Sequence, residues 1–187
     1  MITLSVVTPF VPFRLGKLGL LIAELERQIG DLPVEHLYLG DNKRRTVGAK
    51  RNALLHAAQG KYIAFVDDDD WIKPTYIRDI LRALNKAPDV VTFEQDAYFD
   101  GVHGKVEWRH GQPNEEWSPE RLTMRGAWHP CVWRTEIARM SVFADVNWGE
   151  DWAWAEPLNL LPLKEVHLSK VLHEYHYDTE LSEAHPE

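Results

Sequence analysis

Four aspartates stand side by side in this chain, at Asp67–Asp70, between the apolar run Tyr62–Val66 and Trp71. Adjacent carboxylates repel one another, and each loses hydration when it is buried at the end of a strand. A divalent cation would offset that cost, because Asp67 and Asp69 can both offer oxygen ligands and Asp70 can reach the ion where the backbone turns. The run therefore predicts a metal site. The alternative is an acidic turn that favours the following helix.

A cluster of cations lies upstream of the aspartates. Residues 42–52, with the sequence NKRRTVGAKRN, hold five lysines and arginines in a chain whose formal net charge is −8. The acidic balance argues against a general nucleic-acid-binding surface, which needs many contacts from Lys and Arg to phosphate. The cluster leaves a local anion site open, and a solvated loop leading into a helix is the alternative.

Strands and helices alternate in the first half of the chain. The spacing of apolar residues predicts strands over 2–8, 34–39, 62–66 and 89–94, and helices over 15–29, 46–59 and from Pro74 to residue 84. Thr46 is expected to cap the second helix and Gly60 to end it, while Gly30 ends the first. This order is typical of a parallel sheet covered by helices on both faces.

Three segments follow the strands of this predicted sheet. Pro9 cannot donate within a ladder and is expected to end the first strand, so Thr8-Pro9, Gly40-Asp41 and Asp67–Asp70 all lie at carboxyl ends. Ligands of open α/β sheets bind beyond those ends. The three segments are therefore expected to line one crevice. Beyond residue 94 the regularity is lost, and residues 97–108 predict a hairpin.

Length and composition favour one domain over residues 1–187 in a soluble, cytoplasmic protein without a transmembrane anchor. No apolar run approaches the roughly 20 residues that span a bilayer, and no leader precedes a cleavage site. The single Cys131 has no second thiol for a disulfide or a zinc cluster. A metal site would consequently use oxygen and imidazole ligands, which makes Mg2+ or Mn2+ the expected cation.

The sequence resembles family 2 glycosyltransferases with the GT-A fold in four segments: VVTPF (6–10), GDN (40–42), GAKRNALLHAAQGKYIAFVDDDDWIKPTYI (48–77) and WGEDWAWAE (148–156). The resemblance implies an α/β fold with a Rossmann-like, mostly parallel sheet and a small C-terminal elaboration. Residues 1–95 would bind a nucleotide-sugar, such as a UDP-sugar, and residues 96–187 would supply the acceptor side and the base. It also implies a divalent metal and inversion at the sugar C1.

The resemblance also implies roles for single residues on the donor side. Asp67 matches a carboxylate that contacts the ribose or a metal-bound water, and Asp69 matches the metal ligand. Asp68 replaces a small residue and is expected to be solvated or to lie beside the nucleotide, while Asp70 supports the metal or the sugar. The remaining nucleotide-binding residues would be Thr8 and Pro9 at the base, Asp41 at a uracil-like N–H, and Lys50 and Arg51 facing the nucleotide.

On the acceptor side, the resemblance assigns the general base to Asp151 and the orientation of acceptor or sugar to Glu150. Glu156 stands where the family often has an arginine, which puts the local acceptor contacts in doubt. His176 matches a histidine that many members give to the metal, and His173 lies an odd number of residues away, on the opposite face of a strand. Trp148 and Trp152 offer aromatic faces to a sugar.

Two other functions remain open at this point. A sugar nucleotidyltransferase would show a Gly-rich, basic loop after the first strand, and TPFVPFRLG (8–16) is a poor version of one. A non-catalytic nucleotide- or sugar-binding module would bind a donor without turnover. For a transferase, a saccharide or small molecule is the favoured acceptor, and a protein or a modified DNA base is an alternative. Trp128 and His129 receive no definite role.

Overall fold

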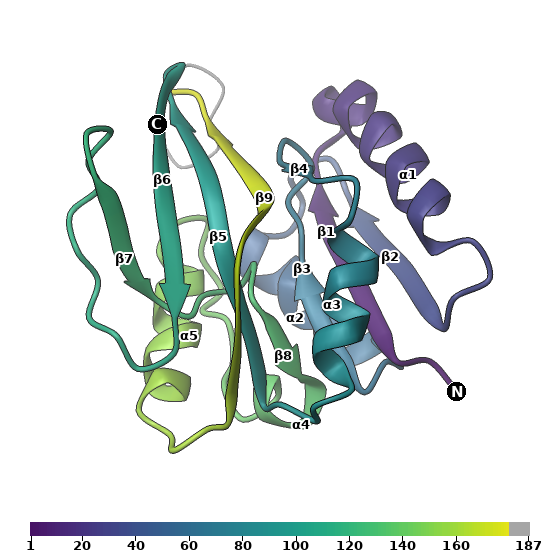
Figure 1. Cartoon of the computed structure of the whole chain (residues 1–187). Coiled ribbons are helices and arrows are strands. Elements are labelled where there is room, and N and C mark those ends of the chain that lie inside the picture. The colour runs from purple at the N-terminus through teal and green to yellow at the C-terminus, as the bar shows by residue number, and fades with distance from the viewer. Residues whose placement is uncertain (180–187) are drawn as a thin grey trace.

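The computed structural model describes residues 1–179, and one mixed sheet runs through them (Figure 1). The strand order is β2-β1-β3-β8-β5-β6-β7, while β9 pairs with β5 and with the short β4. The strands are β1 (Leu4–Phe10), β2 (Val34–Gly40), β3 (Tyr62–Phe65), β4 (Trp71–Ile72), β5 (Val90–Phe99), β6 (Val102–Arg109), β7 (Leu122–Gly126), β8 (Val132–Arg134) and β9 (Glu165–Tyr177).

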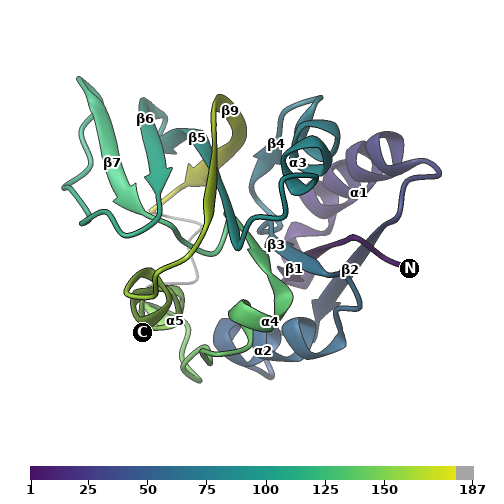
Figure 2. The ribbon, with the colours of Figure 1, turned by 60° about the horizontal axis from the view of Figure 1, so that its bottom comes forward.

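Helices cover both faces of the sheet, as the alternation of elements predicts. They are α1 (Leu15–Ile29), α2 (Val47–Ala57), α3 (Tyr76–Leu84), α4 (Thr135–Ala138) and α5 (Glu150–Asn159), with a 3-10 turn at Pro12–Arg14. Figure 2 shows α1 and α3 on one face and α2, α4 and α5 on the other. Because β1 pairs in parallel with both β2 and β3, the expected α/β class with a mostly parallel sheet is confirmed.

The second half of the sheet departs from a simple alternation. Strand β8 lies between β3 and β5 and is antiparallel to both, so the predicted fourth strand does not pair with the third. Strand β5 also continues to Phe99 and forms the predicted hairpin with β6. On its other edge β5 pairs in parallel with β9. The C-terminal residues therefore extend the same sheet.

Several element ends differ from the sequence prediction. Strand β1 continues through Pro9, because β3 pairs only as far as Val7 and leaves that edge of β1 without a ladder partner for the proline. Helix α2 ends at Ala57, before Gly60, and α3 begins after Pro74. The Thr46 cap is confirmed, since its hydroxyl accepts a hydrogen bond from the backbone N–H of Ala49. Gly30 ends α1 as predicted, with a φ of 48°.

Aromatic side chains fill the core beside the candidate site. Phe143 stacks on Trp154 with ring centroids 4.7 Å apart, and Phe65 meets both rings edge to face. Trp133 and Trp154 are fully buried. By contrast, Trp148 is 76% exposed. The tryptophans thus divide between core packing and an open surface.

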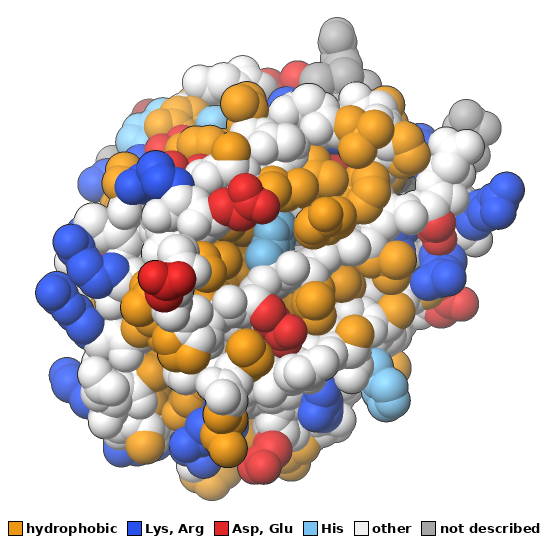
Figure 3. Space-filling view, turned by 90° about the vertical axis from the view of Figure 1, so that its right-hand side faces the viewer, with side chains coloured by type: hydrophobic (Ala, Val, Ile, Leu, Met, Phe, Trp, Pro, Cys, Tyr) orange, Lys and Arg blue, Asp and Glu red, His pale blue; other side chains and the backbone are white. Residues whose placement is uncertain are grey.

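The face that carries α1 and β2 is mixed in character. Hydrophobic side chains reach the surface there between charged ones, among them Leu15, Leu20 and Tyr38 (Figure 3). Within residues 1–179, none of the helices combines the length and the apolar character that a membrane span requires.

Candidate active site

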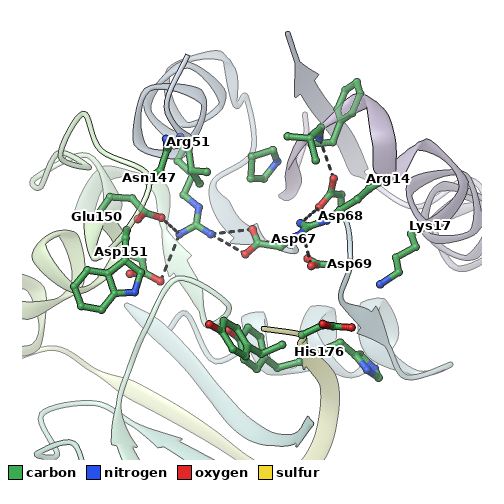
Figure 4. A pocket seen from close by; sticks show the side chains of 18 of the residues that line it. Arg14, Lys17, Arg51, Asp67, Asp68, Asp69, Asn147, Glu150, Asp151 and His176 are labelled. Atoms are coloured by element: carbon green, nitrogen blue, oxygen red, sulfur yellow. Dashed lines mark hydrogen bonds and ion pairs between the residues drawn. The ribbon is translucent and has the colours of Figure 1, made fainter. Parts of the chain in front are cut away.

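A cavity of about 1400 Å³ opens at the carboxyl ends of β1 and β3. Its walls bring together the start of α1, the start of α2, the aspartate run, the start of α5 and the end of β9 (Figure 4). The first and third predicted segments contribute Pro9 and Asp67–Asp69, and α5 contributes Glu150 and Asp151. Two acidic groups that are far apart in the sequence therefore face one space.

Arg51 joins these two acidic groups. Its Nη2 donates to both carboxylate oxygens of Asp67, at 2.9 and 2.7 Å, and its Nη1 lies 2.9 Å from Glu150 and 3.7 Å from Asp151. The guanidinium is almost fully buried. The sequence prediction had Arg51 facing the nucleotide. Arg51 does border the cavity, but its guanidinium is paired with three carboxylates of the protein, because a buried arginine needs such partners.

The docking of α2 against the segment 143–147 sets the position of Arg51. Thr46 donates to Asp145, the backbone N–H of Val47 donates to Asn147, and Asn52 exchanges two hydrogen bonds with the backbone of Phe143. At Gly48 the helix approaches the carbonyl oxygen of Ala144 so closely that a Cβ atom would lie 1.8 Å from it. Only glycine permits this approach.

We expect Gly48→Ala to destabilise the protein, although alanine normally stabilises a helix relative to glycine. The added methyl group must push α2 away from the segment that leads into α5, and overpacking of this kind costs roughly 1–3 kcal/mol. Urea denaturation measures the effect. Gly19→Ala on α1, where a Cβ atom meets nothing within 4 Å, is the matched control and should keep or raise stability. Equal stability of wild type and Gly48→Ala would contradict the packing described here.

The protein's own donors partner every member of the aspartate run. Asp68 accepts from the backbone N–H of Val11 at 2.9 Å and from Arg14 at 3.0 Å, and Asp69 lies 3.0 Å from the same guanidinium. The expectation that Asp68 is solvated is wrong, because its carboxylate is 3% exposed. Asp70 is buried below the cavity wall, where it accepts from the backbone N–H of His176 and faces the imidazole of His173, 3.4 Å away. Asp70 is thus not presented to a sugar.

The surroundings of Asp67, Asp69 and Asp70 shift their pKa values in different directions. Burial raises the pKa of Asp67, but Arg51 and His129 outweigh burial and hold it well below the usual range. For Asp69, burial together with the charges of Asp67 and Asp68 outweighs Arg14 and raises the pKa to about 6. Burial and the neighbouring carboxylates raise the pKa of Asp70 as well. Ionisation is therefore least favourable at Asp69 and Asp70, whereas Asp67 stays charged.

We expect Asp69→Asn to stabilise the metal-free protein at pH 7.5. Asparagine resembles the protonated acid, and above the folded pKa of about 6 the wild type carries the cost of an ionised, partly buried carboxylate. That cost is roughly 1–3 kcal/mol after allowance for partial exposure, and it disappears below the ordinary Asp pKa. Urea denaturation in EDTA at several pH values measures it. A variant that is less stable than wild type at pH 7.5 would contradict this account.

The start of α5 supplies the second acidic group. Gly149 adopts a left-handed conformation with a φ of 76°, and Glu150 and Asp151 follow in the first turn of the helix. One Asp151 oxygen accepts from the backbone N–H of Trp152 at 2.8 Å, and the other lies 3.2 Å from Nδ1 of His129. Burial raises the pKa of Asp151, but His129 and Arg51 outweigh burial and hold the pKa below its usual value. This carboxylate is therefore ionised and can accept a proton.

Burial has the opposite outcome at Glu150. It raises the pKa of that carboxyl above the usual range, with Arg51 opposing it. Glu150 is 4% exposed and is bound to Arg51. Its position makes it a partner of the guanidinium more than a group that reaches outward toward an acceptor.

The remaining predicted site residues lie in different surroundings. Thr8 is buried and bonds to His36, so it does not border the cavity; Asp41 does not border it either, although Asp41 lies 3.9 Å from Lys50, which does. Trp148 and Trp152 both line the cavity with exposed rings, as expected for a sugar-binding surface.

His176 and His173 also differ. The ring of His176 stacks on Tyr98 at 4.7 Å and points away from Asp69 (Figure 4). The ring of His173 is buried against Gln95, and burial lowers the pKa of His173 to about 3. Neither imidazole stands next to Asp69 as a ready second ligand.

The described part of the chain contains no group of three or more His, Cys, Asp or Glu side chains arranged to hold a metal ion. Asp69 nevertheless suits Mg2+ or Mn2+, because these ions are commonly held by one or two carboxylates with water and substrate phosphates completing the shell. The raised pKa of Asp69 marks excess negative charge on the cavity wall. A cation there would have to displace Arg14, which now lies 3.0 Å from the carboxylate.

The sequence analysis did not name Arg14 as a site residue and gave His129 no definite role. Arg14 and His129 both contact aspartates of the run, but each is brought there by a fold contact over more than 50 residues. A lone basic residue after a strand, or a lone histidine in a Trp-rich segment, gives no local signal of such a contact.

Comparison with known proteins places these features in a family. The family model described as "Glycosyl transferase family 2" matches residues 22–144. EpsH of Bacillus subtilis (strain 168), whose name assigns it to the glycosyltransferases, is 43% identical over 54 residues, which are 29% of this chain and 16% of EpsH. The chain thus spans only a small part of that relative.

Solved structures share the fold at low sequence identity. S. aureus TarS superposes with a TM-score of 0.62 and 16% identity over 93% of this chain and 36% of TarS. TarS 1–349 in complex with UDP-GlcNAc superposes with a TM-score of 0.60 and 18% identity, covering 92% of this chain and 58% of TarS 1–349. A197 from STIV superposes with a TM-score of 0.58 and 18% identity, covering 95% of this chain and 87% of A197.

Proposed function

Because this chain belongs to glycosyl transferase family 2, we propose that it moves a sugar from a nucleotide-sugar, in the first instance a UDP-sugar, onto an acceptor hydroxyl. The observation that carries the proposal is the placement of Asp69 and Asp151 on two sides of one large cavity. The complexes of TarS 1–349 with UDP-GlcNAc and with UDP support a uridine nucleotide as the first donor to test.

The cavity residues divide the chemistry between them. Asp151 takes the proton of the acceptor hydroxyl, whose oxygen then attacks C1 of the sugar. The bond from C1 to the diphosphate oxygen breaks with its electron pair leaving on the diphosphate, and a single displacement of this kind inverts C1. Lys50, Arg14 and Lys17 line the cavity and offer positive charge to the diphosphate. Asp69 would hold a Mg2+ or Mn2+ ion, which would supply further charge neutralisation for the leaving group.

Aromatic surface at the cavity mouth supports a saccharide or small-molecule acceptor. Trp148 is 76% exposed and Trp152 43% exposed, and both border the cavity near Asp151. Aromatic rings pack well against the C–H faces of sugars. Proteins and modified DNA bases are the alternatives that an acceptor screen must include.

A donor panel scored by nucleoside-diphosphate release tests the proposal. UDP-, GDP- and TDP-sugars are each incubated with Mn2+, Mg2+ or EDTA, with and without mono- and oligosaccharides, peptides and hydroxymethylated DNA. Release that depends on one donor and rises with one acceptor is the expected result. UDP binding without release under any condition would instead identify a non-catalytic module.

A further inference from the structure

His129 lies behind the reacting carboxylate, in the turn between β7 and β8. That turn is fixed, because the backbone N–H of Cys131 and the indole N–H of Trp133 both donate to the carbonyl oxygen of Trp128. The imidazole is about nine-tenths buried and packs edge-on against Phe65. It does not border the cavity, so it does not touch a bound substrate.

Both ring nitrogens of His129 face charged groups. Nδ1 lies 3.2 Å from an oxygen of Asp151, and Nε2 lies 3.5 Å from Asp67 and 3.4 Å from Nη2 of Arg51. Among the residues that the structure describes, Nδ1 has no hydrogen-bond partner, and an Asp151 oxygen lies 3.2 Å from it as a possible acceptor. One ring thus spans the donor-side and acceptor-side carboxylates.

The neighbours of Nε2 determine where the ring carries hydrogen. Arginine only donates, so a neutral His129 that accepts from Arg51 at Nε2 must carry its hydrogen on Nδ1, directed at Asp151. In the imidazolium, Nε2–H faces Asp67 and Nδ1 is again protonated. Burial and Arg51 lower the pKa of His129, but Asp151 and Asp67 outweigh them and raise it. In both of these states Nδ1 carries a hydrogen, and an Asp151 oxygen lies 3.2 Å from it.

We propose that His129 is a positioning residue for sugar transfer, whose Nδ1–H fixes the Asp151 carboxylate in the orientation that accepts the acceptor proton. This inference rests on the proposed function of Asp151 and adds a residue to it. His129 neither gains nor loses a proton during the reaction. Its contact with Asp67 and Arg51 ties the orientation of the base to the aspartate run on the donor side.

Two substitutions separate this role from simple packing. The amide nitrogen of His129→Asn can replace Nδ1 and still donate to Asp151, whereas the longer His129→Gln places its amide near the Nε2 position. We expect His129→Gln to lower kcat about 10–100-fold with the donor KM nearly unchanged, since misplacing a reacting group by about 1 Å costs this much. His129→Asn should retain most of the activity. His56→Asn and His56→Gln, at an exposed position on α2, are the matched controls.

The pH profile gives a second readout that packing alone would not move. The titratable and charged groups around the ring are Asp67 at the end of β3, Arg51 on α2, Glu150 and Asp151 on α5, and His173 on β9. Without His129 the pKa of Asp151 rises, because one of the groups that lower it is lost. The acid limb of kcat should then move to higher pH in His129→Gln. Wild-type kcat and an unshifted limb in that variant would overturn the proposal.

Nitrogen-15 NMR of the histidine rings tests the arrangement without any substrate. Wild-type His129 should show a protonated Nδ1 from pH 5 to pH 9, and its Nδ1–H resonance should move in Asp151→Asn. An unprotonated Nδ1 overturns the inference even if transfer is observed. Absence of transfer with every donor and acceptor, combined with a protonated Nδ1 whose resonance moves in Asp151→Asn, would instead reject the proposed function and leave the hydrogen bond to Asp151 established.

Discussion

Asp151→Asn should lower kcat for sugar transfer by about 10²–10⁴-fold, the range typical of a lost general base. The carboxylate lies on the cavity wall, and its depressed pKa leaves it ionised and ready to accept a proton. Asparagine keeps the size of the side chain but cannot take that proton. The measurement is initial rates of nucleoside-diphosphate release at saturating donor and acceptor.

Donor binding distinguishes loss of the base from loss of structure. Asp151→Asn should bind UDP with nearly wild-type affinity in calorimetry, because Asp67 lies on the other side of Arg51 from it. Asp31→Asn, at an exposed position after α1, should change neither quantity and serves as the control. Asp151→Asn with full activity would exclude Asp151 as the base.

Arg51→Met should destabilise the protein by roughly 3–5 kcal/mol, as expected when one partner of a buried ion pair is removed. The methionine leaves Asp67 and Glu150 buried without their guanidinium and removes a nearby charge from Asp151. Arg51→Lys should recover only part of the loss, because one ammonium cannot bond to both acidic groups as the planar guanidinium does. Urea denaturation at pH 7.5 measures both variants.

The pH dependence provides the diagnostic control for Arg51. Without the guanidinium, Asp67 loses the charge that lowers its folded pKa most, so the deficit of Arg51→Met is largest at neutral pH. It should shrink toward about pH 4 as the carboxylates take up protons. Arg78→Met, at a 58% exposed arginine on α3, should stay within about 0.5 kcal/mol of wild type. A pH-independent deficit in Arg51→Met would point to lost packing alone.

Local patterns in the sequence predicted the parallel half of the fold. Thr46 caps α2 and Gly30 ends α1 as their residue types indicate, and the aspartate run follows β3 as the apolar pattern requires. The insertion of β8 between β3 and β5 could not be predicted in this way. Its three residues carry no distinctive pattern, and its position is decided by pairing with strands more than 40 residues away.

The acidic residues of the candidate site could be predicted from the sequence, but the arginines that pair with them could not. Asp67, Asp69 and Asp151 were identified by type and by motif, and all three border the cavity. The sequence analysis, however, predicted that a bound divalent cation balances the charge of the aspartate run. The structure shows Arg51 and Arg14 beside it, brought there by the docking of α2 and by the turn after β1. Such pairings depend on the tertiary fold, which residue spacing does not encode.

The position of β8 also determines when the sheet can be completed during synthesis. The edge of β3 that pairs with Arg134 and Trp133 leaves the ribosome about 70 residues before they do, which corresponds to roughly 4–14 s of translation. For that interval an apolar strand lacks its partner, and exposed strand edges of this kind promote aggregation. Slow translation or chaperone binding around residues 66–134 should therefore govern how much of this protein reaches its folded state in a cell.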